Sequence, residues 1–272
     1  MKLKNIVKYQ LSRVIPLLAP SILSEIKADI NPTKNTWLKK QIIDGRVAHA
    51  TKKQNLSQLQ EAHSLYWQGE QGAKFYGAFD GRFEEWFRDE HAVFEVELQN
   101  MMHSRREFRT LLEIGCGDGQ VLNYLSNSLP GIDRGIGIDI NSGIIEENRK
   151  TYSGNSKLKF VSGDAVEGIK SNMGKNCLVM SYGGVLEYFS EESVKEVFNF
   201  VRESPYHTGI ALVEPISPDH DLSTTFNSYV FGQENSFSHN HEHLLKEAGF
   251  EIIFECEKHM ADRWKIIVAI SS

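Results

Sequence analysis

The chain has 272 residues, of which 40% are hydrophobic, 10% aromatic and 24% charged, enough apolar material for one large domain with a charged surface. Its longest charge-free apolar stretch near the start, residues 14–24, contains Pro16 and Pro20 and is shorter than the roughly 20 residues of a membrane-spanning helix. We therefore expect no stable membrane insertion. The prolines and the lack of a cleavage site also argue against a secretory signal.

The net charge of −6 is unevenly distributed along the chain. Residues 1–40 contain eight Lys or Arg and two acidic residues, a charge of +6, so the remaining residues carry −12. An acidic body repels phosphate backbones, and only the basic end could supply contacts to them. The charge pattern thus argues against a nucleic acid partner.

The three cysteines, Cys116, Cys177 and Cys256, are widely spaced and odd in number, and no CxxC motif occurs. This pattern fits reduced thiols better than disulfide bonds or a zinc cluster. We therefore expect a cytoplasmic protein.

Residues 1–105 are predicted to form a helical accessory and lid region, and residues 106–272 the main domain. Residues 1–60 are basic, with apolar residues only locally at helical spacing, which indicates one or two accessory helices or a weak foothold on an anionic membrane surface. Residues 61–105 form either a lid that closes over a ligand or helices that bury an aromatic stripe. Their aromatic residues are Tyr66, Trp67, Phe75, Tyr76, Phe79, Phe83, Trp86, Phe87 and Phe94.

From about residue 109, short β-branched runs alternate with amphipathic helices, which is typical of βαβ units and a parallel sheet. The last two strands have no helix between them. We therefore predict an α/β fold, a Rossmann-like, seven-stranded, mostly parallel sheet with one reversed edge strand, plus an N-terminal helical cap. The predicted strands are 110–114, 135–138, 157–161, 177–181, 210–213, 251–257 and 265–270.

A glycine-rich turn follows the first of these strands. Residues 111–119 read LLEIGCGDG, an apolar strand that runs into GxGxG and then a helix. Ligands of open α/β sheets bind beyond the carboxyl ends of the strands, and glycines allow the backbone to approach them closely. The turn lacks both the final Gly/Ala of the dinucleotide fingerprint and the Lys-Ser/Thr of a phosphate loop. It therefore predicts a ligand without a diphosphate.

Acidic residues end the next two strands. Asp139 ends the second, where a carboxylate can accept both hydroxyls of a ribose. Asp164, in Gly163-Asp164-Ala165, ends the third and can accept a hydrogen bond from an adenine amine. Each acid alone would fit a helix N-cap or a solvated loop as well, but three successive strand ends with such motifs favour a nucleoside site.

These motifs resemble those of the class I S-adenosylmethionine-dependent methyltransferases, over roughly residues 109–271. The residues that carry the resemblance are Glu113 to Gly119, Gly137-Ile138-Asp139, Gly163-Asp164-Ala165, and Ser181 to Glu187 after the fourth strand. The continuation Gly184-Val185-Leu186-Glu187-Tyr188 is similar to the small-molecule branch of the family.

The resemblance implies that S-adenosylmethionine is the methyl donor. It implies that Gly115 and Gly117 bracket the methionine part, that Asp139 holds the ribose, and that the backbone near Ser181 and Tyr182 flanks the sulfonium. Asp164 and Ala165 would frame the adenine. The implied donor-binding residues are Glu113, Gly115, Cys116, Gly117, Asp139, Ile140, Asp164, Ala165, Ser181 and Tyr182.

The residue types agree with such a donor, which contains a ribose and an adenine but no phosphate. A site for it needs closely approaching glycines and carboxylates, and an acidic pocket suits a sulfonium. Methyl transfer is an in-line displacement whose leaving group is a neutral thioether and needs no acid. Alignment of acceptor, methyl and sulfur can therefore supply most of the acceleration, up to about 7–11 kcal/mol.

The methyl acceptor is predicted to be an O or N atom of a small metabolite, for example a sugar or a secondary-metabolite intermediate. Enzymes that methylate amines of nucleic acid bases usually have Asp/Asn-Pro-Pro-Tyr/Phe after the fourth strand, whereas this chain has Ser181-Tyr182-Gly183-Gly184. The alternatives are a protein-directed methyltransferase that docks through the basic residues 1–40, and a non-catalytic donor-binding subunit. The oligomeric state stays open.

An oxygen acceptor would be helped by a general base or a metal, whereas an amine or carboxylate would need neither. Residues 214–221, after the fifth strand, read either as a base or Mg²⁺ site or as a polar loop facing the substrate. His239 is a second candidate base, whereas His241 and His243 fall within a predicted helix over 241–248. The histidines lack the spacing of a helical metal pair, so no metal site is predicted. The candidate catalytic residues are His239, Glu214 and Tyr182.

Overall fold

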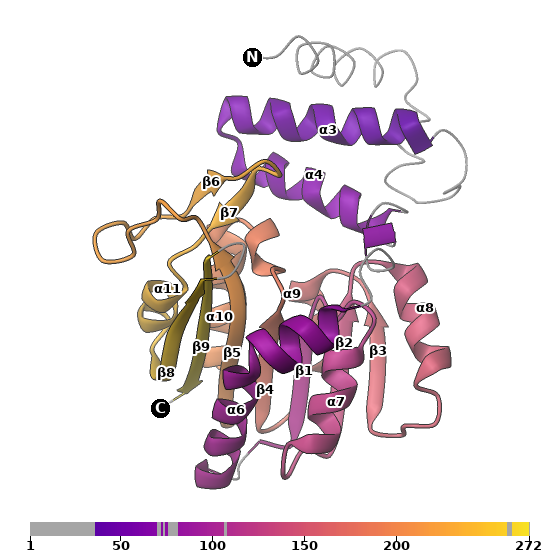
Figure 1. Cartoon of the computed structure of the whole chain (residues 1–272), viewed down its shortest axis with the longest axis vertical. Helices are drawn as coiled ribbons and strands as arrows, with labels where there is room; N and C mark the ends of the chain where they lie inside the picture. The colour runs from indigo at the N-terminus through magenta and orange to yellow at the C-terminus, as the bar shows by residue number, and fades with distance from the viewer. Residues whose placement is uncertain are drawn as a thin grey trace. The chain divides into compact units, whose positions relative to one another are not determined.

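The computed structural model of the chain describes residues 36–69, 72, 74, 75, 81–105, 108–259 and 263–271 (Figure 1). The chain divides into two compact units, residues 1–78 and residues 79–272. Residues 79–105, which the sequence analysis grouped with the N-terminal region, thus fall in the second unit. The expectations for most of the basic segment (residues 1–35), and for the lid aromatics Tyr76 and Phe79, lie outside the described residues.

The first unit contains a helical hairpin, α3 (Thr36–Lys53) and α4 (Leu56–Gln68). The Asn55 side chain caps α4 by accepting a hydrogen bond from the Gln58 N–H at 3.0 Å, which satisfies one of the free donors at the helix start. Ile42, Ile43 and Leu65 form its small buried cluster. This part of the chain is therefore helical, as the accessory-helix interpretation predicts.

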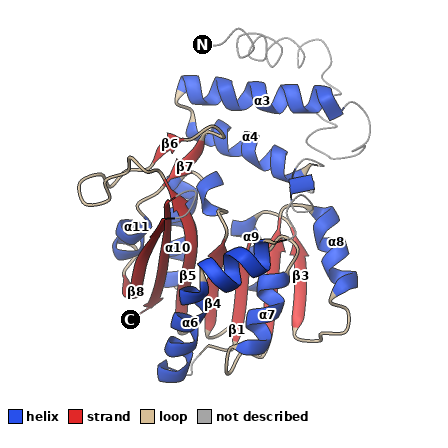
Figure 2. Ribbon diagram, viewed as in Figure 1, coloured by secondary structure: helices blue, strands red, loops and turns tan. Residues whose placement is uncertain are grey.

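The second unit is built on a seven-stranded sheet (Figure 2). Its strands are β1 (Thr110–Ile114), β2 (Arg134–Asp139), β3 (Leu158–Ser162), β4 (Cys177–Tyr182), β5 (Thr208–Ile216), β8 (Phe250–His259) and β9 (Arg263–Ser271). They lie in the order β3-β2-β1-β4-β5-β9-β8. Only β9 is reversed, and it pairs antiparallel with β5 on one side and β8 on the other. The predicted fold is confirmed, with the reversed strand one place in from the edge.

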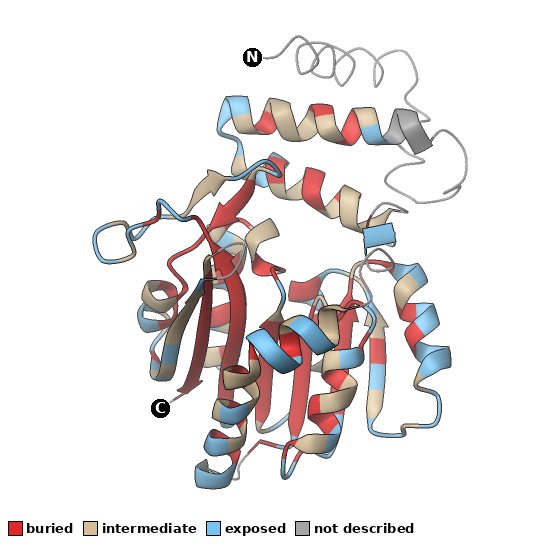
Figure 3. Cartoon of the chain, in the orientation of Figure 1, coloured by how far each residue is buried: buried red, intermediate tan, exposed pale blue. Residues whose placement is uncertain are grey.

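Helices cover both faces of this sheet, and each face has its own buried cluster (Figure 3). The helices are η1 (Arg82–Glu90), α6 (Ala92–Arg105), α7 (Gln120–Ser128), α8 (Ser142–Thr151), α9 (Ala165–Asn172), η2 (Leu186–Tyr188), α10 (Glu191–Arg202) and α11 (His241–Glu247). Alternate strand residues point to opposite faces. In β4, Leu178 and Met180 join the cluster under η1, α6, α7 and α8, whereas Cys177 and Val179 join the one under α9, α10 and α11.

Two elements differ from the sequence-based expectation. The stretch between the predicted strand 210–213 and the predicted helix over 241–248, for which no strand was predicted, contains a hairpin of β6 (Tyr229–Phe231) and β7 (Ser236–Ser238). At three residues each, these strands are too short to show an alternating pattern. The strand β5 extends through Pro215 to Ile216, although Glu214 and Pro215 end the apolar run. Pairing with β9 carries the strand past this point.

In the parts of the chain that the structure describes, no helix combines the length and apolarity needed to span a membrane.

Candidate active site

The sheet order creates a crevice between the carboxyl ends of β1 and β4. From β1 the chain winds outward through β2 and β3, and from β4 it winds the other way through β5, and ligands of open α/β sheets bind at such a switch point. The register places Ile114 of β1 opposite both Ile138 of β2 and Ser181 of β4. The motifs recognised in the sequence therefore meet at one edge of the sheet.

The glycine-rich turn closes tightly over this edge. Gly115 and Gly117 have φ angles of 65° and 50°. Residues other than glycine rarely adopt this region of backbone conformation. A Cβ atom on Gly115 would lie 2.5 Å from Cγ1 of Val185, in the loop after β4. The Cys116 N–H donates to the Ile138 carbonyl at 3.1 Å. The turn is thus pressed against both neighbouring strand ends.

Asp139, the predicted ribose ligand, is buried at the end of β2. Its Oδ2 accepts a hydrogen bond from the Gly117 N–H at 3.0 Å, and its Oδ1 accepts one from the Asn141 N–H at 2.8 Å. A carboxylate has about four lone-pair sites, so each oxygen can also accept from a ligand hydroxyl. The same side chain therefore shapes the glycine turn, and its contact with a ribose stays a prediction.

Two further side chains of the first motif are buried and uncharged. Burial raises the pKa of Glu113 well above its ordinary value, and Asp118 and Asp139 raise it further, which favours the neutral acid. Among the described residues, Oε2 of Glu113 has no hydrogen-bond partner. Burial likewise raises the pKa of the Cys116 thiol. The two buried side chains pack beneath the glycine turn. Their contact with a donor stays a prediction.

The other residues expected to bind the donor follow the ends of β2 and β3. Ile140 follows β2 and is half-buried. Asp164 is exposed and caps α9 by accepting from the Glu167 N–H at 3.2 Å, and Ala165 behind it is buried. The N-cap role, one of the two interpretations of this acid, is therefore present, and its contact with an adenine stays a prediction.

Glu214 supports the loop after β4 from within the protein. It is fully buried, and its Oε1 accepts from the Ser181 hydroxyl at 2.5 Å and from the Val185 N–H at 3.3 Å, while Oε2 accepts from the Leu186 N–H at 3.0 Å. Burial raises its pKa to about 7, against the effect of these hydrogen bonds. Glu214 thus positions the strand end, and its role as a base stays a prediction.

His239, the second candidate base, is also engaged inside the protein. Its Nδ1 lies 2.6 Å from the Ser228 hydroxyl, and its Nε2 lies 3.1 Å from the carbonyl oxygens of Leu186 and Phe189. Two carbonyls accept only from an N–H, so Nε2 holds the proton and Nδ1 accepts from Ser228. Burial lowers the pKa of His239 to about 4. The contacts hold the η2 loop, and proton abstraction by His239 stays a prediction.

Residues 219–221 form a loop that is tied to β7 and to its own next residues by hydrogen bonds. His220 is buried, with Nδ1 2.8 Å from the Ser238 hydroxyl, while Asp221 accepts hydrogen bonds from Ser223 and Thr224. Across the described ranges, no group of three or more His, Cys, Asp or Glu side chains is arranged to hold a metal ion.

A histidine that the sequence analysis did not single out contacts Tyr182. Nδ1 of His91, at the end of η1, lies 3.0 Å from the Tyr182 hydroxyl. Around them lie rings from three elements: Phe87 with its centroid 5.3 Å from that of Tyr182, Phe94 at 6.2 Å, and Trp264, whose centroid is 5.3 Å from that of His91. No sequence pattern links His91 to Tyr182, because 91 residues separate them.

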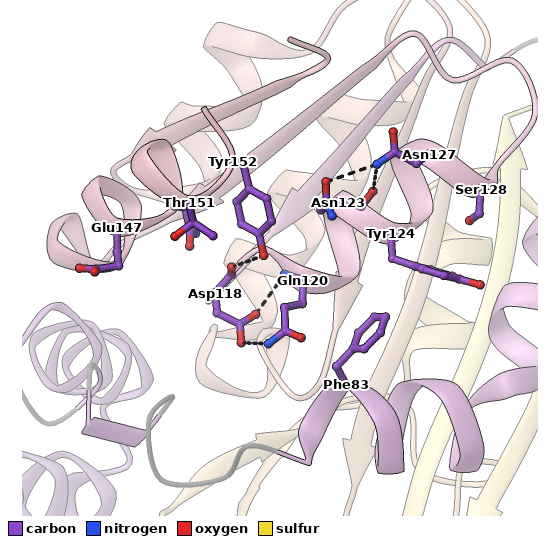
Figure 4. Close-up of a pocket in the computed structure, with 11 residues that line it drawn as sticks. Phe83, Asp118, Gln120, Asn123, Tyr124, Asn127, Ser128, Glu147, Thr151 and Tyr152 are labelled. Atoms are coloured by element: carbon purple, nitrogen blue, oxygen red, sulfur yellow. Dashed lines mark hydrogen bonds between the residues drawn. The ribbon is translucent and has the colours of Figure 1, made fainter. Parts of the chain in front are cut away.

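A cavity of about 770 Å³ lies along α7, between α8 and η1 (Figure 4). At its end near the glycine turn, Asp118 accepts from the Tyr152 hydroxyl through its carbonyl and from the Gln120 amide through its carboxylate. The cavity therefore reaches the glycine turn that follows β1. Its lining residues are Phe83, Asp118, Gln120, Asn123, Tyr124, Asn127, Ser128, Glu147, Asn148, Thr151 and Tyr152.

Comparisons with known proteins agree with this architecture. A magnesium protoporphyrin IX methyltransferase from Synechocystis PCC 6803 superimposes with a TM-score of 0.54 at 14% identity, covering 78% of this chain and 97% of that one. Methyltransferases from Leishmania major and Clostridium acetobutylicum give TM-scores of 0.51 and 0.50 at 13% identity, covering 73% of this chain and 81% and 100% of theirs.

No curated protein matches the chain. Residues 111–204 match the family model described as a methyltransferase domain, which confirms the assignment made from the sequence motifs. The chain therefore carries a methyltransferase domain, with the fold of the S-adenosylmethionine-dependent methyltransferases.

Proposed function

We propose that the protein transfers a methyl group from S-adenosylmethionine to a nitrogen or oxygen atom of a small metabolite. One observation carries the proposal: the glycine turn, the buried Asp139 and the end of β4 meet at the switch point of the sheet. These groups suit a phosphate-free nucleoside. Solved structures with this fold contain S-adenosylmethionine or S-adenosylhomocysteine, which supports the same donor here.

The donor supplies an electrophilic methyl group on a positively charged sulfur. In the transfer, a lone pair of the acceptor forms a bond to the methyl carbon while the carbon–sulfur bond breaks and its electron pair stays on sulfur. The chain's part is to fix geometry. Gly115 and Gly117 allow the donor to approach the backbone, Asp139 accepts from its ribose, and the end of β4 bounds the side that the acceptor enters.

The contacts of the two candidate bases favour a nitrogen acceptor. Glu214 and His239 direct their polar atoms to Ser181, Leu186 and other protein groups. A neutral amine has a reactive lone pair and releases its proton after the methyl transfer, so it needs no general base in the reaction step. We therefore propose Glu214 and His239 as positioning residues, and Tyr182, at the end of β4, stays the remaining candidate catalytic residue.

A small molecule is the acceptor class that the chain supports best. The acidic body argues against nucleic acid, as does Ser181-Tyr182-Gly183-Gly184 at the end of β4. One enzyme with this fold is named for a small acceptor, magnesium protoporphyrin IX. The three free cysteines support a cytoplasmic reaction.

The ribose role of Asp139 predicts a loss of donor affinity in Asp139→Asn. The amide keeps the size of the side chain but replaces one acceptor oxygen by a donor, so the Kd for S-adenosylmethionine should rise at least about tenfold, as expected for a lost hydrogen bond to a charged group. Isothermal titration calorimetry measures this. Asp133→Asn, at an exposed position, should keep the wild-type Kd, and an unchanged Kd in Asp139→Asn would exclude the ribose contact.

The acceptor class is tested by following conversion of S-adenosylmethionine to S-adenosylhomocysteine. The proposal predicts turnover with a deproteinised metabolite extract and none with total protein or RNA. Turnover with protein alone would instead identify a protein-directed enzyme. Donor binding without turnover in any fraction would identify a donor-binding subunit.

A further inference from the structure

The cavity along α7 is separate from the residues proposed to bind the donor. Its volume of about 770 Å³ lies within the range of about 300–1,000 Å³ that is usual for small-molecule sites. It reaches the glycine turn at Asp118, but none of the residues proposed to bind the donor lines it. The cavity is therefore available to a second ligand.

Aromatic rings from three parts of the chain line this cavity. Tyr152, directly after α8, lies on one side, and Phe83 of η1 and Tyr124 of α7 lie on the other (Figure 4). The centroids of Phe83 and Tyr124 are 5.5 Å apart. The guanidinium of Arg88 lies over the Tyr124 ring, 4.6 Å from its centroid, so one of these rings already contacts a cation. The rings offer a ligand apolar surface and faces that attract positive charge.

The charge of the lining is negative. Asp118 and Glu147 supply two carboxylates, and no Lys, Arg or His occurs among the described residues that line the cavity. The Asp118 carboxylate accepts hydrogen bonds from the uncharged Gln120, at 3.1 and 2.8 Å. Within the described part of the chain, Glu147 makes no ion pair, whereas its neighbour Glu146 pairs with Arg149. The lining itself thus leaves both charges uncompensated, which favours a cationic ligand.

The neighbouring phenol responds to this negative charge. Burial raises the pKa of Tyr152 to about 12, with contributions from Asp118 and Glu113. The Tyr152 hydroxyl therefore stays protonated, and it donates to the Asp118 carbonyl at 3.1 Å. An electrostatic environment that disfavours a phenolate favours a cation at the same place.

We propose that this cavity binds an organic ammonium ion, with its charge against the carboxylates of Asp118 and Glu147 and its hydrocarbon part against the rings of Phe83, Tyr124 and Tyr152. Carboxylates and ring faces both attract such a cation. A phosphate or carboxylate ligand would meet two like charges. A bare metal ion would find no group of three ligating side chains among the described residues.

NMR titrations of the full chain with phenethylammonium and with phenethyl alcohol test the proposal. The two probes share a ring and a short carbon chain and differ in charge. We expect the ammonium probe to bind about fivefold more tightly than the alcohol, the scale of one contact between unit charges near the surface. Its affinity should fall as the salt concentration rises, because exposed charges are screened.

Substitutions on α8 and η1 locate the site. Glu147→Gln should lower the affinity for the ammonium probe about threefold to fivefold and leave that for the alcohol unchanged. Glu146→Gln, at the adjacent exposed position outside the cavity, is the matched control and should keep the wild-type affinity. Phe83→Leu removes a ring and keeps apolar volume, so it should weaken binding of the ammonium probe about threefold.

Saturating S-adenosylhomocysteine should leave binding of the ammonium probe in place, since the residues proposed to bind the donor lie outside the cavity. Displacement of the probe by this ligand would instead locate the probe in the donor crevice and overturn the second site. Absence of ammonium binding, equal affinities for the two probes, or equal effects of Glu146→Gln and Glu147→Gln would overturn it as well. None of these results would contradict methyl transfer from S-adenosylmethionine.

Discussion

Between pH 6.5 and pH 4, protonation of His91 and His239 will remove about 6 kcal/mol from the free energy of unfolding, against the opposite contribution of Glu214. Burial lowers the pKa of both His91 and His239 to about 4 from 6.5. In this window both histidines bind protons in the unfolded chain but not in the folded protein, so their contribution to stability falls as the pH falls. Each group contributes about 3 kcal/mol at 1.36 kcal/mol per unit.

Urea unfolding followed by tryptophan fluorescence at pH 6.5, 5.5, 4.5 and 4 measures this loss. His91→Asn is neutral throughout and keeps a hydrogen-bonding group, so its stability should fall by about 3 kcal/mol less than that of the wild type over the full window. His103→Asn, at an exposed position, should follow the wild type. A pH dependence of His91→Asn that matches the wild type would show that His91 is not buried in its neutral form.

Glu214→Ala will lower the free energy of unfolding by at least about 3 kcal/mol, because each of three buried donors left without an acceptor costs about 1–3 kcal/mol. The change leaves the Ser181 hydroxyl and the Val185 and Leu186 N–H groups without their acceptor. These groups belong to the end of β4 and the loop that Gly115 touches. We therefore expect donor affinity to fall together with stability. Denaturant unfolding and calorimetry measure the two effects.

Glu214→Gln is the matched control, because it keeps the shape of the side chain and one acceptor oxygen. The variant also lacks the ionisable carboxyl group, so residue 214 no longer contributes to the pH dependence of stability. The pKa of Glu214 is raised from 4.5 to about 7, so the folded state binds the proton more tightly and its stability falls as the pH rises from 4.5 to 7. Relative to Glu214→Gln, the wild type should lose about 3 kcal/mol over this window. Parallel stability curves would contradict a buried, proton-binding Glu214.

The sheet was predictable because local patterns specify it. The strands β1, β2 and β4 are short apolar runs, the glycine turn follows β1 and Asp139 ends β2, so the residue pattern alone was enough to place these motifs at strand ends. The helix face of Val194, Val197, Phe198 and Val201 is buried, as its spacing predicts. The sequence was sufficient to predict those features whose position in the fold follows directly from their order in the chain.

The partners of the site residues were not predictable in the same way. Glu214 accepts from Ser181 across 33 residues, and His91 meets Tyr182 across 91; such pairs depend on how β4 packs beside β5 and under η1. The sequence marks Glu214 and His239 as ionisable groups near the right edge of the sheet. Only the structure shows that their polar atoms face the protein, which changes their proposed part from proton transfer to positioning.

The central claim is that the crevice between β1 and β4 binds S-adenosylmethionine, and calorimetric titration of the purified, folded protein tests it most directly. We predict saturable binding at one site, weakened at least about tenfold by Asp139→Asn, and no binding of NAD, because the glycine turn lacks the diphosphate fingerprint. Absence of binding heat for S-adenosylmethionine at several temperatures, with protein that unfolds cooperatively, would contradict this claim.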